Sequence, residues 1–172
     1  MQKIFSYPIQ IDKLTGAEKN FHLVADDEQK DWIAQIFQVE SVRSFSADIC
    51  VKSEKKGHII KVFGKAEADI EQKSVISLEN FVRKYESDFE IFYDTKATYA
   101  QIREEYEDIN EDAPEVVENG EIDIAAVAME QIAVLLDDYP RQEGEIFEFV
   151  SEFDEETTKS NNPFAVLQKI KK

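Results

Sequence analysis

Hydrophobic and polar residues alternate most regularly in two segments, 43–51 and 60–70, on either side of Lys55–Gly57. Alternation with a period of two is typical of strands that bury one face. The two segments therefore predict a β-hairpin that turns at Lys55–Gly57. Its expected buried face holds Arg43, Phe45, Ala47, Ile49 and Val51 on the first strand and Ile60, Val62, Gly64, Ala66, Ala68 and Ile70 on the second.

Three further segments have strand character. Residues 4–11 alternate loosely before the turn at Thr15–Gly16, and Phe21–Val24 predicts a second short strand. The stretch Val75–Tyr93 is apolar and aromatic but long for one straight strand. We therefore expect it to break or bulge around Arg83–Asp88.

Helical spacing follows two capping signals. Asp26, with Gln29 three residues later, predicts a helix that starts at this cap and ends near Val39. Asp123 predicts a second helix, which runs to Asp138 and is stopped by Pro140. A third, short helix is predicted to start at Asn162, with Pro163 in its first turn.

These elements predict an α+β fold. We expect a mostly antiparallel, strongly bent sheet with two or three packed helices and a flexible acidic insertion. A chain of 172 residues with 42% hydrophobic residues can bury one core, so residues 1–172 are expected to form a single domain.

The net charge of −17 is concentrated in two windows. Residues 104–123 contain ten acids and no base, and residues 142–158 contain seven acids and no base. The other 20 acids balance the 20 Lys and Arg residues, so the remainder is formally neutral. We expect flexible acidic segments at 97–121 and 142–160, kept open by self-repulsion. The alternative is that these carboxylates bind a basic partner.

Composition gives no sign of catalysis, of a cofactor or of a metal site. Cys50 is the single cysteine, His22 and His58 have no metal-ligand spacing, and the five glycines include no phosphate-binding loop. Apolar runs are far too short for a membrane span, and no signal-peptide core follows Met1. We expect a soluble, cytoplasmic protein that is not an enzyme and has no membrane partner and no small-molecule substrate.

The outward face of the predicted hairpin combines lysines with an aromatic ring. Phosphate contacts from lysines, together with base stacking, are common in single-strand RNA binding. The alternative is that the lysines only keep the strands soluble, since Glu67 and Asp69 continue this face with the opposite sign. The candidate RNA contacts are Lys52, Lys55, Lys56, Lys61, Phe63 and Lys65.

Three separated segments carry a family resemblance. They are Ser74–Phe81 (SVISLENF), Asp137–Arg141 (DDYPR) and Asn162–Leu167 (NPFAVL), and Ile122–Ile124 precedes the second. Together they resemble the YceD family, the large ribosomal RNA subunit accumulation proteins. Ser74 and Ser77 stand where one branch of the family has cysteines, so this chain resembles the cysteine-poor branch. The positions that match the family pattern are Ser74, Ser77, Leu78, Glu79, Phe81, Glu130, Tyr139, Pro140, Arg141, Pro163 and Phe164.

The resemblance implies a non-catalytic role in large-subunit ribosome biogenesis. It implies accumulation or processing of large-subunit ribosomal RNA, through binding of the rRNA precursor or, alternatively, of a basic ribosomal protein. Glu130 lies in the apolar middle of its predicted helix, where a carboxylate facing a core must be paired or protonated. We therefore expect Glu130 to pair with Arg141 as a structural anchor.

Overall fold

The structure is a computed structural model that describes residues 4–14, 16–54, 58–99, 101–102, 113–117 and 119–146. The chain divides into two units, Met1–Gln142 and Glu143–Lys172, and every helix and strand named below lies in the first. The predicted C-terminal helix and the Lys55–Gly57 turn lie outside the described residues. The expectation of a single domain stays a prediction.

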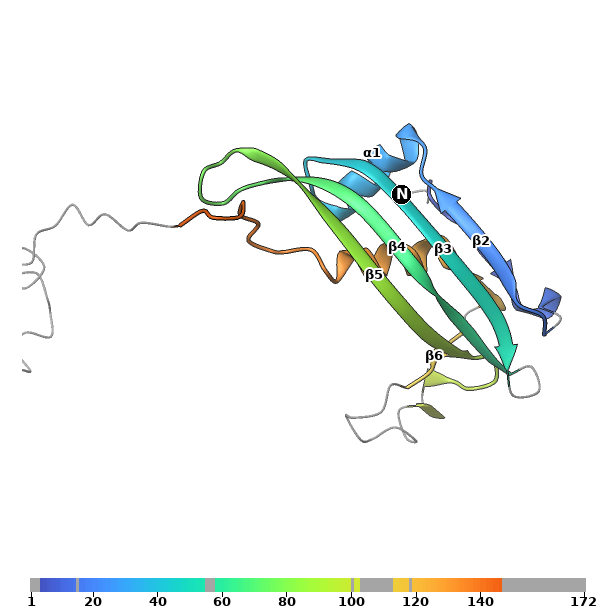
Figure 1. Cartoon of the computed structure of the whole chain (residues 1–172). Coiled ribbons are helices and arrows are strands. Elements are labelled where there is room, and N and C mark those ends of the chain that lie inside the picture. The colour runs from blue at the N-terminus through green and yellow to red at the C-terminus, as the bar shows by residue number, and fades with distance from the viewer. Residues whose placement is uncertain are drawn as a thin grey trace, which may run out of the picture. The chain divides into compact units, whose positions relative to one another are not determined.

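A five-stranded sheet is the centre of the first unit (Figure 1). Its order is β2-β3-β4-β5-β6, and all neighbours are antiparallel except the parallel pair β5–β6. A small second sheet pairs β1 with β7. The strands are β1 (Pro8–Gln10), β2 (Lys19–Val24), β3 (Ser41–Glu54), β4 (Ile59–Lys73), β5 (Asn80–Asp94), β6 (Glu115–Val116) and β7 (Glu121–Asp123).

Two α-helices are described, α1 (Asp27–Phe37) and α3 (Ile124–Ala133), together with a single 3₁₀ turn, η1 (Ile11–Lys13). The predicted α+β class with a mostly antiparallel sheet is confirmed. The strong bending of the sheet stays a prediction. The first strand is shorter than predicted, because the chain turns into η1 at Ile11 after only three residues of β1.

The predicted hairpin is confirmed as β3 and β4, whose alternate residues are buried. Arg43 is an exception, because its side chain is exposed and Val42 takes the buried position. The register shifts between Val42 and Ser44, and such a bulge moves the preceding side chains to the opposite face. The alternation of hydrophobic and polar residues along the sequence does not reveal such a bulge.

The predicted break in β5 is wrong. The strand pairs with β4 without a register shift from Asn80, opposite Lys73, to Asp94, opposite Ile59. A partner of equal length lets β5 continue through Arg83–Asp88. The interruption lies earlier, where Val75–Ser77 form the turn between β4 and β5.

Both predicted helix starts are confirmed. The Asp26 carboxylate accepts a hydrogen bond from the Gln29 amide at 2.9 Å, and the Gln29 side chain accepts one from the Asp26 amide at 2.9 Å. The Asp123 carboxylate accepts from the Ala126 amide at 3.3 Å. However, α3 ends at Ala133, five residues before the predicted Asp138, and the Leu135 amide already bonds three residues back to Ile132.

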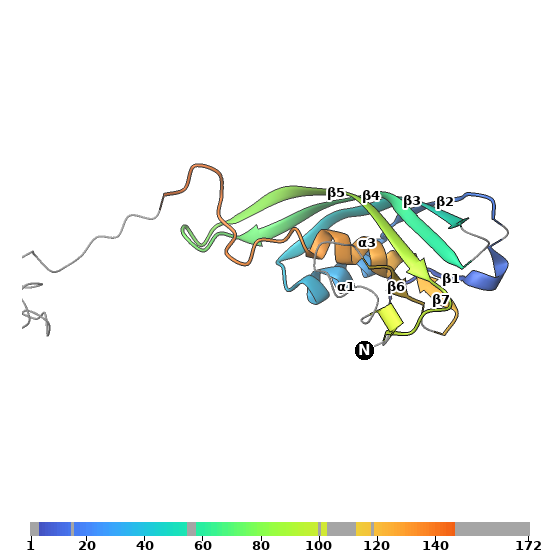
Figure 2. The ribbon, with the colours of Figure 1, turned by 90° about the horizontal axis from the view of Figure 1, so that it is seen from below.

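Helices α1 and α3 lie on the same side of the five-stranded sheet (Figure 2). Between them and the sheet is one hydrophobic core, in which Ile33, Phe45, Val62, Ile124 and Ile132 are fully or almost fully buried. Burying one such large side chain contributes about 1.5–3 kcal/mol. In the described part of the chain no helix is long and apolar enough to cross a membrane.

The described part of the acidic segment 97–121 includes ordered elements. Strand β6 pairs with the end of β5, and Glu121 begins β7. Residues 100, 103–112 and 118 of this segment, and residues 147–160 of the second acidic segment, lie outside the described residues. The flexibility of these segments stays a prediction.

Gly64 provides a test of the β3–β4 pairing. A Cβ atom at this position would lie 2.1 Å from the carbonyl oxygen of Asp48 and 2.9 Å from the Cα of Ile49, both backbone atoms of β3. We expect Gly64→Ala to lower the free energy of unfolding by roughly 1–3 kcal/mol, because backbone cannot move aside without disturbing the ladder. Urea unfolding would measure this. Ser46→Ala on the opposite face is the control, and equal stabilities of the two variants would contradict the pairing.

Candidate functional site

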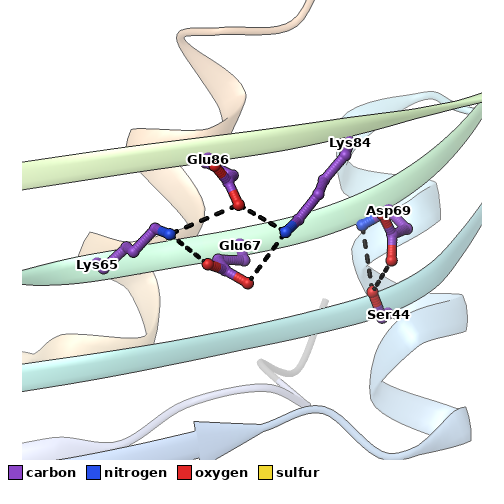
Figure 3. A network of polar contacts seen from close by, with 6 residues as sticks. All are labelled: Ser44, Lys65, Glu67, Asp69, Lys84 and Glu86. Carbon is purple, nitrogen blue, oxygen red and sulfur yellow. Dashed lines mark hydrogen bonds and ion pairs between the residues drawn. The ribbon is translucent and has the colours of Figure 1, made fainter.

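The sheet face opposite α1 and α3, called the open face below, carries charged side chains in ion pairs. Lys65 and Lys84 of β4 and β5 alternate with Glu67 and Glu86 in one network (Figure 3). The Lys65–Glu67 and Lys84–Glu86 distances are both 2.5 Å. The hydrogen bond with Glu67 raises the pKa of Lys65, and that with Glu86 raises the pKa of Lys84. Each ammonium group therefore already has a carboxylate partner.

The other described lysines among the candidate RNA contacts are paired too. Lys52 lies 3.1 Å from Glu18, and Lys61 lies 2.7 Å from Glu90. Phe63 is half-buried, with the Lys61 ammonium 5.0 Å from its ring centroid. Lys55 and Lys56 lie outside the described residues. On the open face, a phosphate group would thus have to compete with a carboxylate for Lys52, Lys61 and Lys65.

A histidine, a carboxylate and a thiol also lie near one another on the open face. His22 Nδ1 is 2.6 Å from Asp48 Oδ1, and the same residues line a shallow depression with Cys50. A catalytic cysteine needs a lowered pKa, because its thiolate is the nucleophile. Here burial, followed by the charge of Glu18, raises the pKa of Cys50, and no hydrogen bond joins the thiol to His22. The direction of this shift is the opposite of the one that activates a nucleophilic cysteine.

Two segments singled out in the sequence meet at one end of the sheet. The Val75 amide, in the β4–β5 turn, donates to the Pro140 carbonyl oxygen at 2.9 Å. The Arg83 guanidinium donates to the Arg141 carbonyl oxygen at 2.7 Å and lies 3.9 Å from Asp137. The structure thus brings Ser74–Phe81 and Asp137–Arg141 together, although about sixty residues separate them. Arg83, which makes two of these contacts, was not singled out by the sequence.

The β4–β5 turn is organised by Ser74, which is only 1% exposed. Its hydroxyl oxygen accepts hydrogen bonds from the Ile76 and Ser77 amides at 3.1 and 3.3 Å. Its backbone amide donates to the Glu79 carbonyl oxygen at 2.9 Å. Inside this turn Leu78 has a φ of 63° and a side chain that is 66% exposed. The turn therefore holds an apolar side chain outward in a backbone conformation that is unfavourable for leucine.

The remaining matched positions differ in their surroundings. Ser77, Glu79 and Tyr139 are exposed, Pro140 is half-buried, and Arg141 is exposed. Phe81 is half-buried with the Arg83 guanidinium 5.3 Å from its ring centroid. Pro163 and Phe164 lie outside the described residues.

The expectation that Glu130 faces the core is wrong, because this residue is exposed. Helix α3 buries Met129 and Ile132 on either side of it, so its apolar surface is wide but does not include position 130. Glu130 is near Tyr93, whose pKa is raised by burial and, to a smaller degree, by the charges of Glu130 and Glu115. The Glu130–Arg141 pair stays a prediction.

A groove of about 690 Å³ has Pro140, which is hydrogen-bonded to the β4–β5 turn, in its lining. It is formed by the C-terminal part of α1, the end of β4, α3 and residues 136–140. Apolar side chains line it, among them Trp32, Ile36 and Leu136, and acidic residues accompany them. No pattern in the sequence indicated this groove. Its lining comes from several separate segments of the chain, and their meeting depends on the tertiary fold rather than on any spacing along the sequence.

Within the described residues no group of three or more histidine, cysteine, aspartate or glutamate side chains is arranged to hold a metal ion. Three surface features stand out among the described residues. These are the charge-paired open face, the turn with Leu78, and the groove.

Comparison with known proteins gave one match. The profile of a family described as "Large ribosomal RNA subunit accumulation protein YceD" matches residues 62–171. The matched range starts within β4 and includes β5, α3 and all three segments singled out in the sequence. No curated protein and no solved structure matched the chain.

We expect Ser74→Ala to destabilise the protein by roughly 1 kcal/mol, because the turn amides of Ile76 and Ser77 lose their acceptor. Thermal unfolding of the full chain measures the loss. Ser46→Ala, at a half-buried serine of β3 outside the turn, is the matched control, and an equal loss in both variants would contradict the special role of the Ser74 hydroxyl.

The raised pKa of Cys50 predicts slow alkylation at neutral pH. Its thiolate fraction at a given pH is smaller than that of an unperturbed thiol, so the reaction with iodoacetamide should accelerate only at a higher pH than usual. The rate for the folded chain, followed by mass spectrometry from pH 7 to 10, is compared with that in urea. A folded-state profile shifted to lower pH would show an activated cysteine and reopen the possibility of catalysis.

Proposed function

Because the chain belongs to the YceD family of large ribosomal RNA subunit accumulation proteins, we propose that it is a non-catalytic factor that promotes accumulation of large-subunit ribosomal RNA. The family match covers well over half of the chain. It also includes the contact between Ser74–Phe81 and Asp137–Arg141, which are two of the three segments that carry the resemblance.

We infer further that the direct partner is a basic ribosomal protein rather than the rRNA precursor. RNA binding depends on lysine and arginine side chains that replace the counterions of the phosphates. Lys52, Lys61 and Lys65 instead lie beside Glu18, Glu90 and Glu67, respectively. The pairing of these lysines is the observation that favours a protein partner.

Charge supports the same inference. The chain has a net charge of −17, and its excess acids are concentrated in residues 104–123 and 142–158. Such a chain repels nucleic acid at long range and attracts cationic proteins. A basic ribosomal protein held by these acids is shielded from unspecific contacts with RNA until it is incorporated. Accumulation of the rRNA would follow indirectly, because assembly with ribosomal protein protects the RNA.

The test uses a tagged copy in cells whose own copy of the protein has been removed. Loss of the protein should lower the ratio of large- to small-subunit rRNA, and the tagged copy should restore it. Purification should enrich a defined large-subunit ribosomal protein in a salt-sensitive manner. Ultraviolet crosslinking should enrich no region of rRNA above the untagged control.

Two matched variants separate the partner classes. Replacement of the acids within residues 104–121 by their amides should abolish capture of the ribosomal protein, because the counter-charge is removed. Lys61→Gln with Lys65→Gln should leave this capture unchanged. A defined rRNA crosslink that is lost in the lysine variant would instead establish RNA binding by the open face. An unchanged rRNA ratio in cells without the protein would overturn the proposed function as a whole.

A further inference from the structure

We propose that the groove formed by α1, the end of β4, α3 and residues 136–140 is a docking site for an apolar, basic segment of a partner protein. This inference deepens the proposed function and rests on it only for the partner's ribosomal origin. The docking site itself is inferred from the side chains that line the groove, from their charges and from the hydrogen bonds that hold one of its walls.

The apolar side chains of the groove make up a binding floor. Trp32 and Met129 are 8% and 7% exposed, so they are fixed parts of the core as well as parts of the lining. Ile36 lies at the same groove and remains 46% exposed. An apolar partner side chain placed here would remove part of this surface from water.

The charges around the floor favour a cationic occupant. The lining includes four acids, Glu40, Glu130, Asp137 and Asp138, and one base, Lys73. Arg83 partly offsets Asp137 at 3.9 Å. The acids are exposed, so an incoming cationic side chain can reach them from solvent.

The same charges argue against the other occupants. RNA phosphates and anionic lipid headgroups are negatively charged, so the four acids repel them. A second copy of this chain, docked by the same surface, would place acids opposite acids. Lysine and arginine side chains beside an apolar stripe complement both features of the groove.

Trp32 adds a hydrogen-bond donor to the lining of the groove. Its indole Nε1–H is buried and has no hydrogen-bond partner among the described residues. A buried donor without an acceptor carries a desolvation cost, which a small rearrangement onto a carbonyl oxygen of the occupant would relieve. A peptide supplies such oxygens along its whole length.

One wall of the groove is held in place from outside. Pro140 and Asp137 belong to this wall, and the bonds from Val75 to Pro140 and from Arg83 to Arg141 tie it to the β4–β5 turn. The groove is therefore formed before any partner arrives. An amphipathic helix, with apolar residues at helical spacing and lysine or arginine on its flanks, is the segment that such a groove fits best.

The single tryptophan of the chain makes the groove directly observable. Trp32 is the only tryptophan in 172 residues, and it lines the groove. The full chain is titrated with a tryptophan-free amphipathic peptide of leucine and lysine, about 18 residues long so that it can form a helix. The emission of Trp32 should change saturably. The same peptide with glutamate in place of lysine should cause no such change at equal concentration.

Matched variants locate the binding. Glu40→Gln with Asp138→Asn removes two charges at the groove and should raise the dissociation constant of the peptide about three- to tenfold at low salt. Asp12→Asn with Asp88→Asn removes two exposed charges elsewhere and should leave it unchanged. Ile36→Ser should weaken binding by about tenfold through lost apolar contact. Thermal unfolding checks that each variant is folded.

Each contrary result has a distinct meaning. Absence of a saturable change, equal binding of the acidic peptide, or equal weakening in both double variants would overturn the docking site. If that happens while the 104–121 amide variant still loses its ribosomal protein, the proposed function stands without this site. If the groove binds as expected while cells without the protein keep a normal rRNA ratio, the site stands and the proposed function fails.

Discussion

The uninterrupted pairing of β4 with β5 is the constraint on which the rest of the structure depends. Fifteen consecutive residue pairs, from Lys73–Asn80 to Ile59–Asp94, join these strands, and β3 extends the ladder on the other edge of β4. Because side chains alternate along a strand, this register decides at once which residues enter the core and which face water. Ile60, Val62 and Ile70 are buried in the core on one side, and Lys61 and Lys65 are left on the other.

A sheet that is covered on one side only must keep its second side compatible with water. Here that is achieved by cross-strand pairs of opposite charge, such as Lys61–Glu90 and Lys65–Glu86, rather than by charges of one sign. The arrangement gives the ammonium groups of Lys61 and Lys65 carboxylate partners on the open face itself. It also explains why a row of lysines in the sequence is a poor guide to nucleic-acid binding, since each lysine has a carboxylate partner, which comes from the same strand for Lys65, from β5 for Lys61 and from the chain before β2 for Lys52.

The sequence was sufficient to predict features that depend on neighbours along the chain. The capping residues Asp26 and Asp123 and the alternation in β3 and β4 are local signals, and each was confirmed. Features that depend on tertiary pairing could not be predicted in this way. The continuous β5, the bulge beside Arg43 and the exposure of Glu130 each follow from a partner strand or from the way α3 lies on the sheet. The groove and the junction at Pro140 combine distant segments, so the sequence could supply their residues but not their meeting.

Leu78 in the β4–β5 turn combines an unfavourable backbone conformation with an exposed apolar side chain. Glycine or asparagine would adopt its φ of 63° at lower cost, since a left-handed conformation costs other residues about 1–2 kcal/mol. The chain keeps a large apolar side chain there instead, 66% exposed, on a turn made rigid by Ser74. A variant selected purely for thermal stability would be expected to lose this leucine early. Stability engineering of this protein would therefore replace an exposed apolar side chain of the turn while it keeps the Ser74 hydrogen bonds that hold the turn.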